Sequence, residues 1–564
     1  MSSVGLNGTV VQSGSRIFVS GSSSGIDTNA LIDAAVQQRL READLIDIRI
    51  DENLLRSQGY DQLQALGGSV QSSLDALRRS YGFSGSGSSV YEQKTGTLSS
   101  NTATDPTSLL NVSIDETAAS GTHTIVVREK AREHIITSDP IADPTAALGQ
   151  NGSFRLRLPG QAQININVTG TDNLNDIAAK INAVTADTGV GAAVVKVNET
   201  NYKLVLTGQE TGVNIRREGI SGDNVLQAIG VLDGANAYKN TAQTSEKARL
   251  TYNGIDIARD DNSFDDLITG VNLDVLNADV GTTITLNIGQ DNAGIKSAIL
   301  DFVDSYNALR DFVLQNQVVN SDGTVPEDVL LANDNLLEQV DNQLQSLVGL
   351  NFNTGAQETL AEIGIEFDAN NRLTVDELVL DTAIIDDPDV VRNIFQTQYS
   401  DDNAEFEILS NTSTQVSLNF ALDITTDGTN ITNVSVGGDN TLFTFSGGTI
   451  KGAAGTIYEG ISFAYVGTAS TTVNIAFDQG FADLASNTLE GLVNTVDGLI
   501  QQEKLAIEST NENLQSRADR VRERAEAYRL SLIERYARFE SQLNQANGLL
   551  NQIRAILGTN DDDN

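Results

Sequence analysis

Residues Gly21-Ser22-Ser23-Ser24-Gly25 match the G-x-S-x-G pattern of a nucleophile elbow, the strand-to-helix turn that exposes a catalytic serine. A serine hydrolase also needs a histidine as general base, and the chain has only His123 and His134. We favour another explanation, because the match falls in a Gly/Ser tract, where composition alone produces such patterns. Both histidines are expected on strands or strand edges, without a metal or catalytic role, since no cluster of partner residues accompanies them.

Other chemical signatures are missing from the sequence. There is no cysteine, so neither disulfides nor thiolate metal sites can form. No Walker A, complete G-x-G-x-x-G, H-E-x-x-H or EF-hand pattern occurs. Residues 85–87 (GSG) are interpreted as linker, and the aspartates at 561–563 as a solvated tail rather than a cation site. The sequence therefore predicts a protein that is not an enzyme and needs no cofactor or metal.

Charge and hydropathy exclude further classes of function. The net charge is −40, and nucleic-acid binding needs a basic surface, so no nucleic-acid partner is expected. No apolar run approaches the roughly 20 residues of a membrane span, so we expect no membrane insertion. Residues 1–25 lack the basic start and apolar core of a cleaved signal peptide, so export would need another route.

Both ends of the chain carry helical periodicity and have almost balanced charge. Residues 1–25 are expected to be a flexible tail, and Asp27 or Thr28 to cap a helical stem over 26–81. Gly67 and Gly68 are expected to bend or break that helix, because glycine weakens helix interiors. The apolar stripe that carries the prediction is Ile32, Val36, Leu40, Ile46, Ile50, Leu54, Leu63, Leu66, Val70, Leu74 and Leu77.

The C-terminal segment 481–558 has the strongest periodicity and predicts a coiled-coil stem, followed by an acidic tail over 559–564. One stutter is expected near Leu532, where the local repeat becomes 11. Two interpretations remain open: two antiparallel helices of an ordinary bundle, or terminal helices that pair and then assemble with copies of themselves. The length of the stripe favours assembly, and its residues are Leu514, Val521, Ala525, Tyr528, Leu532, Tyr536, Phe539, Leu543, Ala546, Leu550, Ile553 and Leu557.

The middle of the chain has a different texture, with short alternating strands, such as 122–128, 152–158 and 202–207, separated by Asn, Gly and Asp turns and interrupted by a short amphipathic helix over 174–184. We predict a linker over 82–100, a β-rich head of one or two domains over 101–290, a helical core over 291–400 and a β-rich insertion over 401–480. Within the helical core, helices are expected over 294–315, 334–348 and 376–397. The fold class is therefore α+β and multidomain, with long N- and C-terminal helices forming a stem and the β-rich domains inserted between them.

The segment around Gly25, Ile26 and Asp27 resembles the N-terminal signature of the flagellar filament cap family, also called hook-associated protein 2 or FliD. Six further segments resemble parts of that family and occur in the same order. They are residues 121–127; 164–207, which is similar to a motif shared with flagellin; 252–273; 302–307; 363–376; and 536–550. Two segments depart from the family pattern, the charged run 128–134 and the insertion at 405–478.

The resemblance implies a structural role at the distal tip of the bacterial flagellum, outside the cell. Such proteins leave through the flagellar type III channel, form a homo-oligomeric ring, promote flagellin polymerisation and retain unpolymerised flagellin, and some relatives also adhere to surfaces. The implied partners are further copies of the chain, flagellin, hook–filament junction proteins and an export chaperone. One alternative is a flagellin or a hook–filament junction protein, which should show its own terminal motifs in place of Gly25-Ile26-Asp27. The other is an extracellular enzyme or stand-alone adhesin, which should show a cleaved signal peptide or a cluster of polar residues.

Overall fold

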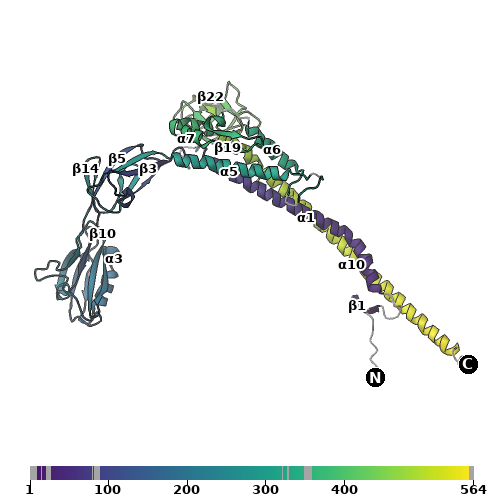
Figure 1. Cartoon of the computed structure of the whole chain (residues 1–564), viewed down its shortest axis with the longest axis horizontal. Helices are drawn as coiled ribbons and strands as arrows, with labels where there is room; N and C mark the ends of the chain where they lie inside the picture. The colour runs from purple at the N-terminus through teal and green to yellow at the C-terminus, as the bar shows by residue number, and fades with distance from the viewer. Residues whose placement is uncertain are drawn as a thin grey trace. The chain divides into compact units, whose positions relative to one another are not determined.

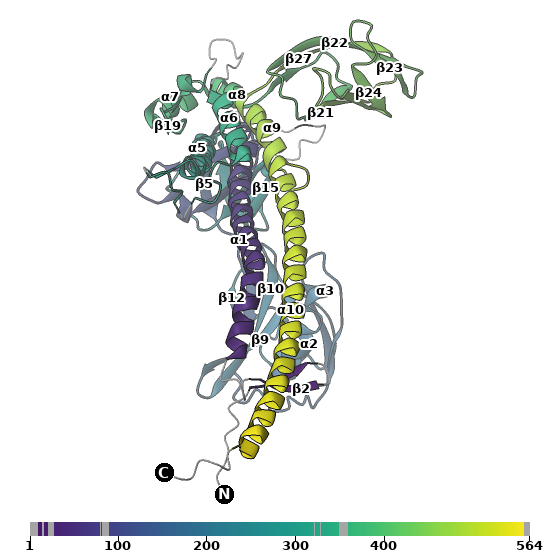
Figure 2. The same ribbon diagram turned by 90° about the vertical axis from the view of Figure 1, so that its right-hand side faces the viewer.

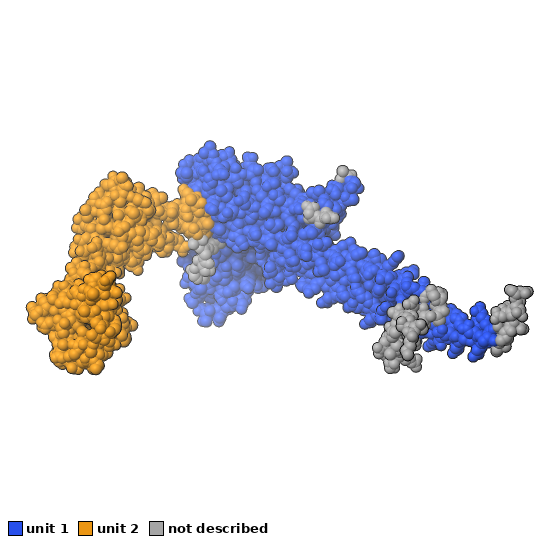
Figure 3. Space-filling view, turned by 60° about the horizontal axis from the view of Figure 1, so that its bottom comes forward, with its two compact units in different colours: residues 1–86, 296–564 blue, residues 87–295 orange. Residues whose placement is uncertain are grey.

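The computed structural model describes residues 27–78, 81, 89–320, 322–326, 329–348 and 359–557, and the backbone of 9–13 and 16–20. The chain divides into two compact units, residues 1–86 with 296–564, and residues 87–295 (Figure 3). None of the helices in these described segments is long and apolar enough to cross a bilayer.

Two long helices dominate the first unit, α1 (Thr28–Asp75) and α10 (Leu499–Leu557). They lie side by side in both ribbon views (Figures 1 and 2). They are antiparallel, because Ile32 packs near Leu532 whereas Ile46, later in α1, packs near Val521, earlier in α10. The predicted N-cap is confirmed: the Asp27 side chain accepts the Ala30 N–H at 3.0 Å.

The helix α1 continues through Gly67 and Gly68, so the expected break is wrong. A Cβ atom built on Gly67 would lie 2.3 Å from Cγ1 of Val493, whereas one on Gly68 would meet nothing within 4 Å. Gly67 therefore allows another helix, α9 (Phe481–Val493), to approach α1 closely. Packing against that helix compensates for the weak helix propensity of glycine.

A helical core packs beside the long pair. The predicted segments 294–315 and 334–348 form α5 (Asn292–Asn316) and α6 (Asn335–Val348). The segment 376–397 forms two helices, α7 (Glu377–Asp386) and α8 (Pro388–Phe395), since Pro388 starts a new helix at its first turn. The rings of Phe302, Phe395 and Phe481 meet edge to face in the centre. A short turn η2 (Leu360–Ile363) and the hairpin β18 (Ile365–Phe367) and β19 (Leu373–Val375) complete this core.

Residues 398–478 form two antiparallel four-stranded sheets around one core. One sheet has the order β20-β27-β22-β23 and the other β21-β26-β25-β24. The strands are β20 (Gln398–Ser400), β21 (Phe406–Asn411), β22 (Ser417–Thr426), β23 (Ile431–Ser435), β24 (Phe443–Ser446), β25 (Thr449–Gly452), β26 (Ile461–Tyr465) and β27 (Thr471–Asp478).

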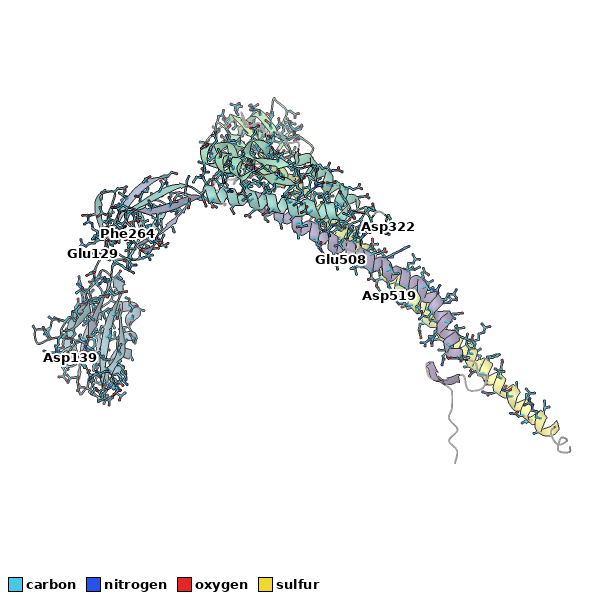
Figure 4. All side chains as sticks on the ribbon, in the orientation of Figure 1. Glu129, Asp139, Phe264, Asp322, Glu508 and Asp519 are labelled. Carbon is cyan, nitrogen blue, oxygen red and sulfur yellow. The ribbon has the colours of Figure 1, made fainter. Side chains whose placement is uncertain are left out.

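The second unit contains two hydrophobic cores, and each lies between two sheets. The first core has a five-stranded and a three-stranded sheet, and the second has a four-stranded and a three-stranded sheet. The first core, which includes Phe264 (Figure 4), lies between sheets β14-β13-β5-β17-β3 and β15-β16-β4. Its elements are β3 (Lys94–Ser100), η1 (Pro106–Ser108), β4 (Leu110–Ile114), β5 (Gly121–Glu129), β13 (Ala248–Tyr252), β14 (Ile255–Arg259), β15 (Ser263–Ile268), β16 (Val271–Val275) and β17 (Ile284–Gln290).

The second core lies between sheets β12-β6-β10-β9 and β11-β7-β8, with the predicted amphipathic helix as α2. Its elements are β6 (Glu133–Thr137), β7 (Gly152–Arg157), β8 (Ile166–Val168), α2 (Leu174–Asn182), α3 (Thr185–Thr188), β9 (Val190–Asn198), β10 (Asn201–Thr211), β11 (Arg216–Gly222), α4 (Val225–Ala228) and β12 (Thr241–Gln243).

Two predicted boundaries are wrong. The segment 481–558, expected as one C-terminal stem, contains two helices, because α9 ends at Val493 and α10 begins only at Leu499; α9 packs against α1 beside Gly67. Residues 94–100, expected as the end of a linker, form β3, which pairs along its whole length with β17. The Ser and Thr residues that suggested a linker also suit a strand, and pairing with β17 satisfies their backbone hydrogen bonds. The expectation of a flexible tail over 1–25 is wrong for residues 9–13 and 16–20, whose backbone forms the antiparallel hairpin of β1 (Thr9–Ser13) and β2 (Arg16–Ser20). The rest of that tail, residues 82–88 of the linker and the acidic tail over 559–564 lie outside the described residues.

Candidate assembly surface

The seam between α1 and α10 buries the first part of each predicted stripe. Ile32 and Val36 pack with Leu532 in one cluster, where Leu40 and Tyr528 are partly buried. Further along the seam, Ala43, Ile46, Ala518 and Val521 form a second cluster with the partly buried Ile50 and Leu514. The seam residues of the predicted stem are thus covered by the chain's own second helix.

The C-terminal half of α1 packs differently, against the helical core. Leu63, Val70 and Leu74 are fully buried, and Leu66 is partly buried. The Gln64 amide donates to the Val493 carbonyl at 3.1 Å, across the contact with α9. This half of the stripe therefore anchors the stem to the rest of its unit.

Ion pairs also cross the seam of α1 and α10. They join Glu42 to Arg517 at 2.7 Å, Asp47 to Arg522 at 2.5 Å, Asp33 to Arg529 at 3.5 Å and Asp61 to Lys504 at 2.5 Å. The hydrogen bond from Arg517 lowers the pKa of Glu42, and the hydrogen bond to Asp47 raises the pKa of Arg522. Such exposed pairs contribute little stability each, so their main effect is to favour this antiparallel register.

The stripe on α10 continues past the end of α1. Since Ile32 lies beside Leu532, the first residue of α1 is level with about residue 536, and the remaining 20 or so residues of α10 extend roughly 30 Å further. Figure 1 shows α10 running on alone toward the C-terminus, apart from the contact with the strand β2 (Arg16–Ser20), which pairs with β1 (Thr9–Ser13). Four of the predicted stem residues lie on this α10 tail, which we define as residues 537–557: Phe539, Leu543, Leu550 and Ile553.

Most stripe residues of the α10 tail are exposed, whereas those of the seam are buried, although Glu540 on the tail is buried and β2 contacts α10. Phe539, Leu550 and Ile553 are each 49% exposed, and Leu543 is partly buried. The same heptad spacing therefore has two outcomes along one helix, because a partner helix is present only as far as residue 536. An apolar stripe left uncovered at this length is typical of a surface that packs in an assembly.

Sequence reasoning missed a second apolar stripe, on the face of α1 away from α10. It consists of Leu31, Leu45, Ile48 and Leu55, which are 48–63% exposed. Their separations of 14, 3 and 7 residues follow a heptad and could have revealed the stripe. The stronger signal of the seam residues, one position away in the sequence, hid it.

The residues considered for catalysis are not brought together. Residues 21–26 of the elbow pattern, with Gly25 and Ile26, lie outside the described residues, and Asp27 is the helix cap. His123 stacks on Tyr252 and shares a 2.7 Å hydrogen bond with its hydroxyl. His134 is buried, and its Nδ1 accepts the Ile215 N–H at 3.1 Å. Across the segments that the structure describes, no group of three or more His, Asp or Glu residues is arranged to hold a metal ion.

Comparison with known families decides the identity. The model of the flagellar hook-associated protein 2 C-terminus matches residues 245–548, more than half of the chain, and the model of its N-terminus matches residues 24–134. The flagellin hook IN motif matches residues 149–209. The chain belongs to the flagellar hook-associated protein 2 family. The N-terminal match begins just before the capping residue Asp27, and the C-terminal match includes both the seam part of α10 and the start of its tail.

Individual members of the hook-associated protein 2 family are similar at moderate identity. The B-type flagellar hook-associated protein 2 of Pseudomonas aeruginosa is 29% identical over 307 residues, which cover 51% of this chain and 64% of the relative. The flagellar hook-associated protein 2 of Salmonella typhimurium is 27% identical over 216 residues, which cover 37% of this chain and 46% of the relative. The chain therefore spans less than two thirds of the length of these two relatives.

A solved structure of the family is also similar. It is the flagellar cap protein FliD of Escherichia coli, domains D1-D2-D3, with 23% identity and a TM-score of 0.45 over 60% of this chain and 89% of that chain. The resemblance expected from the sequence motifs is confirmed by the family matches, and this family is a structural one rather than a family of enzymes.

Proposed function

We propose that this chain caps the distal end of the bacterial flagellar filament. In this role copies of the chain form a ring that promotes flagellin polymerisation and prevents the loss of unpolymerised flagellin, and filament elongation and motility depend on it. Membership of the hook-associated protein 2 family supports the place on the flagellum. The geometric observation that carries the assembly role is the uncovered stripe on the α10 tail.

The helices α1 and α10 act in this proposal as a coiled-coil stem, and the α10 tail joins the stems of neighbouring copies. Fully burying a Leu, Ile or Phe side chain stabilises a protein by about 1.5–3 kcal/mol. Since Phe539, Leu550 and Ile553 are half exposed, covering the rest contributes about 1 kcal/mol for each residue. Tails that lie at the same height around a ring axis can cover one another in this way.

The proposed partners are further copies of the chain, flagellin, hook–filament junction proteins and a flagellar export chaperone. Export through the flagellar type III channel delivers the chain to the extracellular tip. The net charge of −40 argues against nucleic-acid binding, and the protein acts without inserting into a membrane. A secondary role in adhesion would use the β-rich head, and no catalytic activity is proposed.

The test of the cap function is the fate of flagellin in a strain that lacks this gene. We expect unpolymerised flagellin in the medium, bare hooks in electron micrographs, and filaments that regrow when purified protein is added. Filaments of normal length without the gene would refute the cap function.

The test of the α10 tail is a double substitution, Leu543→Asp with Leu550→Asp. It should abolish rings in light scattering and filament regrowth, while circular dichroism stays unchanged. The matched control is Asn544→Asp with Asn551→Asp, which adds the same number of negative charges. Each of these exposed residues follows a stripe residue by one position and therefore points about 100° away from it around the helix. If both double variants form rings equally well, the tail is not the assembly surface.

A further inference from the structure

The outer stripe of α1, which we define as Leu31, Leu45, Ile48 and Leu55, faces away from α10. Ile48 precedes the seam residue Ile50 by two positions, which places it about 200° further around the helix. Single exposed leucines need no explanation, but Leu45, Ile48 and Leu55 lie close together on one face of the helix, and Leu31 lies further along the same face. The stripe is interrupted by the charged residues Arg41 and Glu52.

A groove lies at the same height of the stem, between α1 and α10. It has a volume of about 790 Å³ and is lined by Ile50 and Leu54 from α1 and by Leu505 and Ile507 from α10. Leu54 is 49% exposed and Leu505 is 52% exposed, so the groove offers aliphatic side chains at its surface. It forms where apolar contact between the helices gives way to a 2.7 Å hydrogen bond between the amides of Asn53 and Asn511.

We propose that the outer stripe of α1 in one copy packs into the α1–α10 groove of the next copy, and that repetition of this contact builds the ring. The proposal rests on the proposed function, which requires a homo-oligomer. A contact between two different surfaces of one chain is heterologous, and such contacts close into rings when the rotation between copies allows it.

Height along the stem is the main argument for a second copy as the occupant. Copies related by rotation about an axis parallel to the stem keep the same height, so only surfaces at equal height can meet in a ring. The stripe residues Ile48 and Leu55 occupy the same turns of α1 as the groove residues Ile50 and Leu54, and Leu45 lies about one turn away. Leu31 lies about 28 Å along the helix from Ile50 and takes no part in the contact. They lie on nearly opposite sides of the helix pair, as neighbours on either side of each copy require.

Charge gives the direction in which the stripe enters the groove. Arg49 borders the outer stripe on one side, and Asp44 and Asp51 border it on the other. Glu508, labelled in Figure 4, and Glu512 line the α10 side of the groove, together with Lys504, whose charge is paired with Asp61 at 2.5 Å. If the stripe enters the groove with Arg49 toward α10 of the next copy, Arg49 lies opposite Glu508 and Glu512 of that copy. Asp44 and Asp51 then lie beside α1 of the next copy.

Cysteine cross-linking tests the contact directly, because the chain has no cysteine. The double variant Leu55→Cys with Glu508→Cys places one thiol on the outer stripe and one at the groove. Within one chain α1 itself separates the two positions, so a short bismaleimide can join them only between copies. We expect a ladder of covalent multimers from the double variant and only monomers from each single variant, with ring formation retained in light scattering.

Mixing two disrupted variants provides a second readout. Ile48→Asp spoils the stripe and leaves the groove intact, whereas Leu505→Asp spoils the groove and leaves the stripe intact. Each alone should stop ring growth at monomers, and an equimolar mixture should form heterodimers, because one good contact remains. The control Val496→Asp changes an aliphatic residue that is 81% exposed outside both surfaces, and it should leave rings unchanged.

Three results would overturn the contact. Rings of the double cysteine variant that give no cross-linked multimers would place the interface elsewhere. Cross-linked dimers from Leu55→Cys alone would mean that two stripes face each other. Mixed variants that stay monomeric would exclude a stripe-to-groove contact. A wild-type chain that forms no rings and restores no filaments would instead refute the proposed function, and the contact with it.

Discussion

Two carboxylates, one exposed and one buried, contact the same arginine just beyond the end of α1. Asp75 lies 3.2 Å from the Arg78 guanidinium with its side chain 65% exposed, whereas Asp483 lies 2.8 Å away and is fully buried. Asp483 also accepts a 2.6 Å hydrogen bond from the Thr397 hydroxyl. This carboxylate therefore ties α1 to the first turn of α9 and to the start of the β-rich insertion.

We predict that Asp483→Ala destabilises this junction far more than Asp75→Ala. Burial acts to lower the pKa of Arg78, but the charge and hydrogen bond of Asp483, together with the charges of Tyr81 and Asp75, outweigh it. The pKa of Arg78 is therefore raised, and the guanidinium stays charged. Removing one partner of a buried pair costs up to about 3–5 kcal/mol, and here the exposed Asp75 compensates the charge of Arg78 only weakly. Removing an exposed partner costs about 0–1 kcal/mol.

Hydrogen exchange measured by mass spectrometry separates the two outcomes, since it reports opening of α8 and α9 rather than unfolding of the whole chain. Because each 1.4 kcal/mol is a factor of about ten, Asp483→Ala should speed exchange in α9 by roughly two to three and a half powers of ten. Asp75→Ala should change it by less than about fivefold. Similar effects of the two substitutions would show that burial of the pair does not set its strength.

Two further predictions concern stability. Burial lowers the pKa of His134, so this side chain is neutral in the folded protein. The second core of residues 87–295 should therefore keep its full stability above about pH 6.5 and become less stable as the pH falls further, because the unfolded chain then binds a proton at His134. Calorimetry should show no such loss of stability in the variant His134→Gln. Gly67→Ala should destabilise by about 1–3 kcal/mol through collision with Val493, whereas Gly68→Ala should stabilise by up to about 1 kcal/mol. Chemical denaturation followed by circular dichroism measures both glycine variants, and effects of equal sign would contradict this reading of the packing.

Local patterns in the sequence were enough to place most of the elements. The heptad stripe of residues 514–557 predicted α10, and the segments 122–128, 152–158 and 202–207 became β5, β7 and β10 with small changes at their ends. Alternation and helical periodicity succeed because each residue's face follows directly from the geometry of its own element.

Composition alone was a poorer guide. It could not distinguish the strand β3 from a linker, because Ser and Thr serve both and only pairing with β17 decides. Nor did it indicate that the β-rich head holds two cores, since that depends on which strands share a sheet. The buried role of Asp483 was equally invisible, because its partner Arg78 lies about 400 residues away in the sequence.

The sequence by itself determined that α1 and α10 each carry an apolar face, and the family motifs determined where the chain belongs. Only the tertiary structure decided which part of each face is covered. Val521 and Leu550 occupy the same stripe of one helix, yet Val521 is buried and Leu550 is half exposed. The physical reason is that periodicity fixes the direction of a side chain, whereas its burial depends on how far an antiparallel partner extends, and α1 ends before the α10 tail begins.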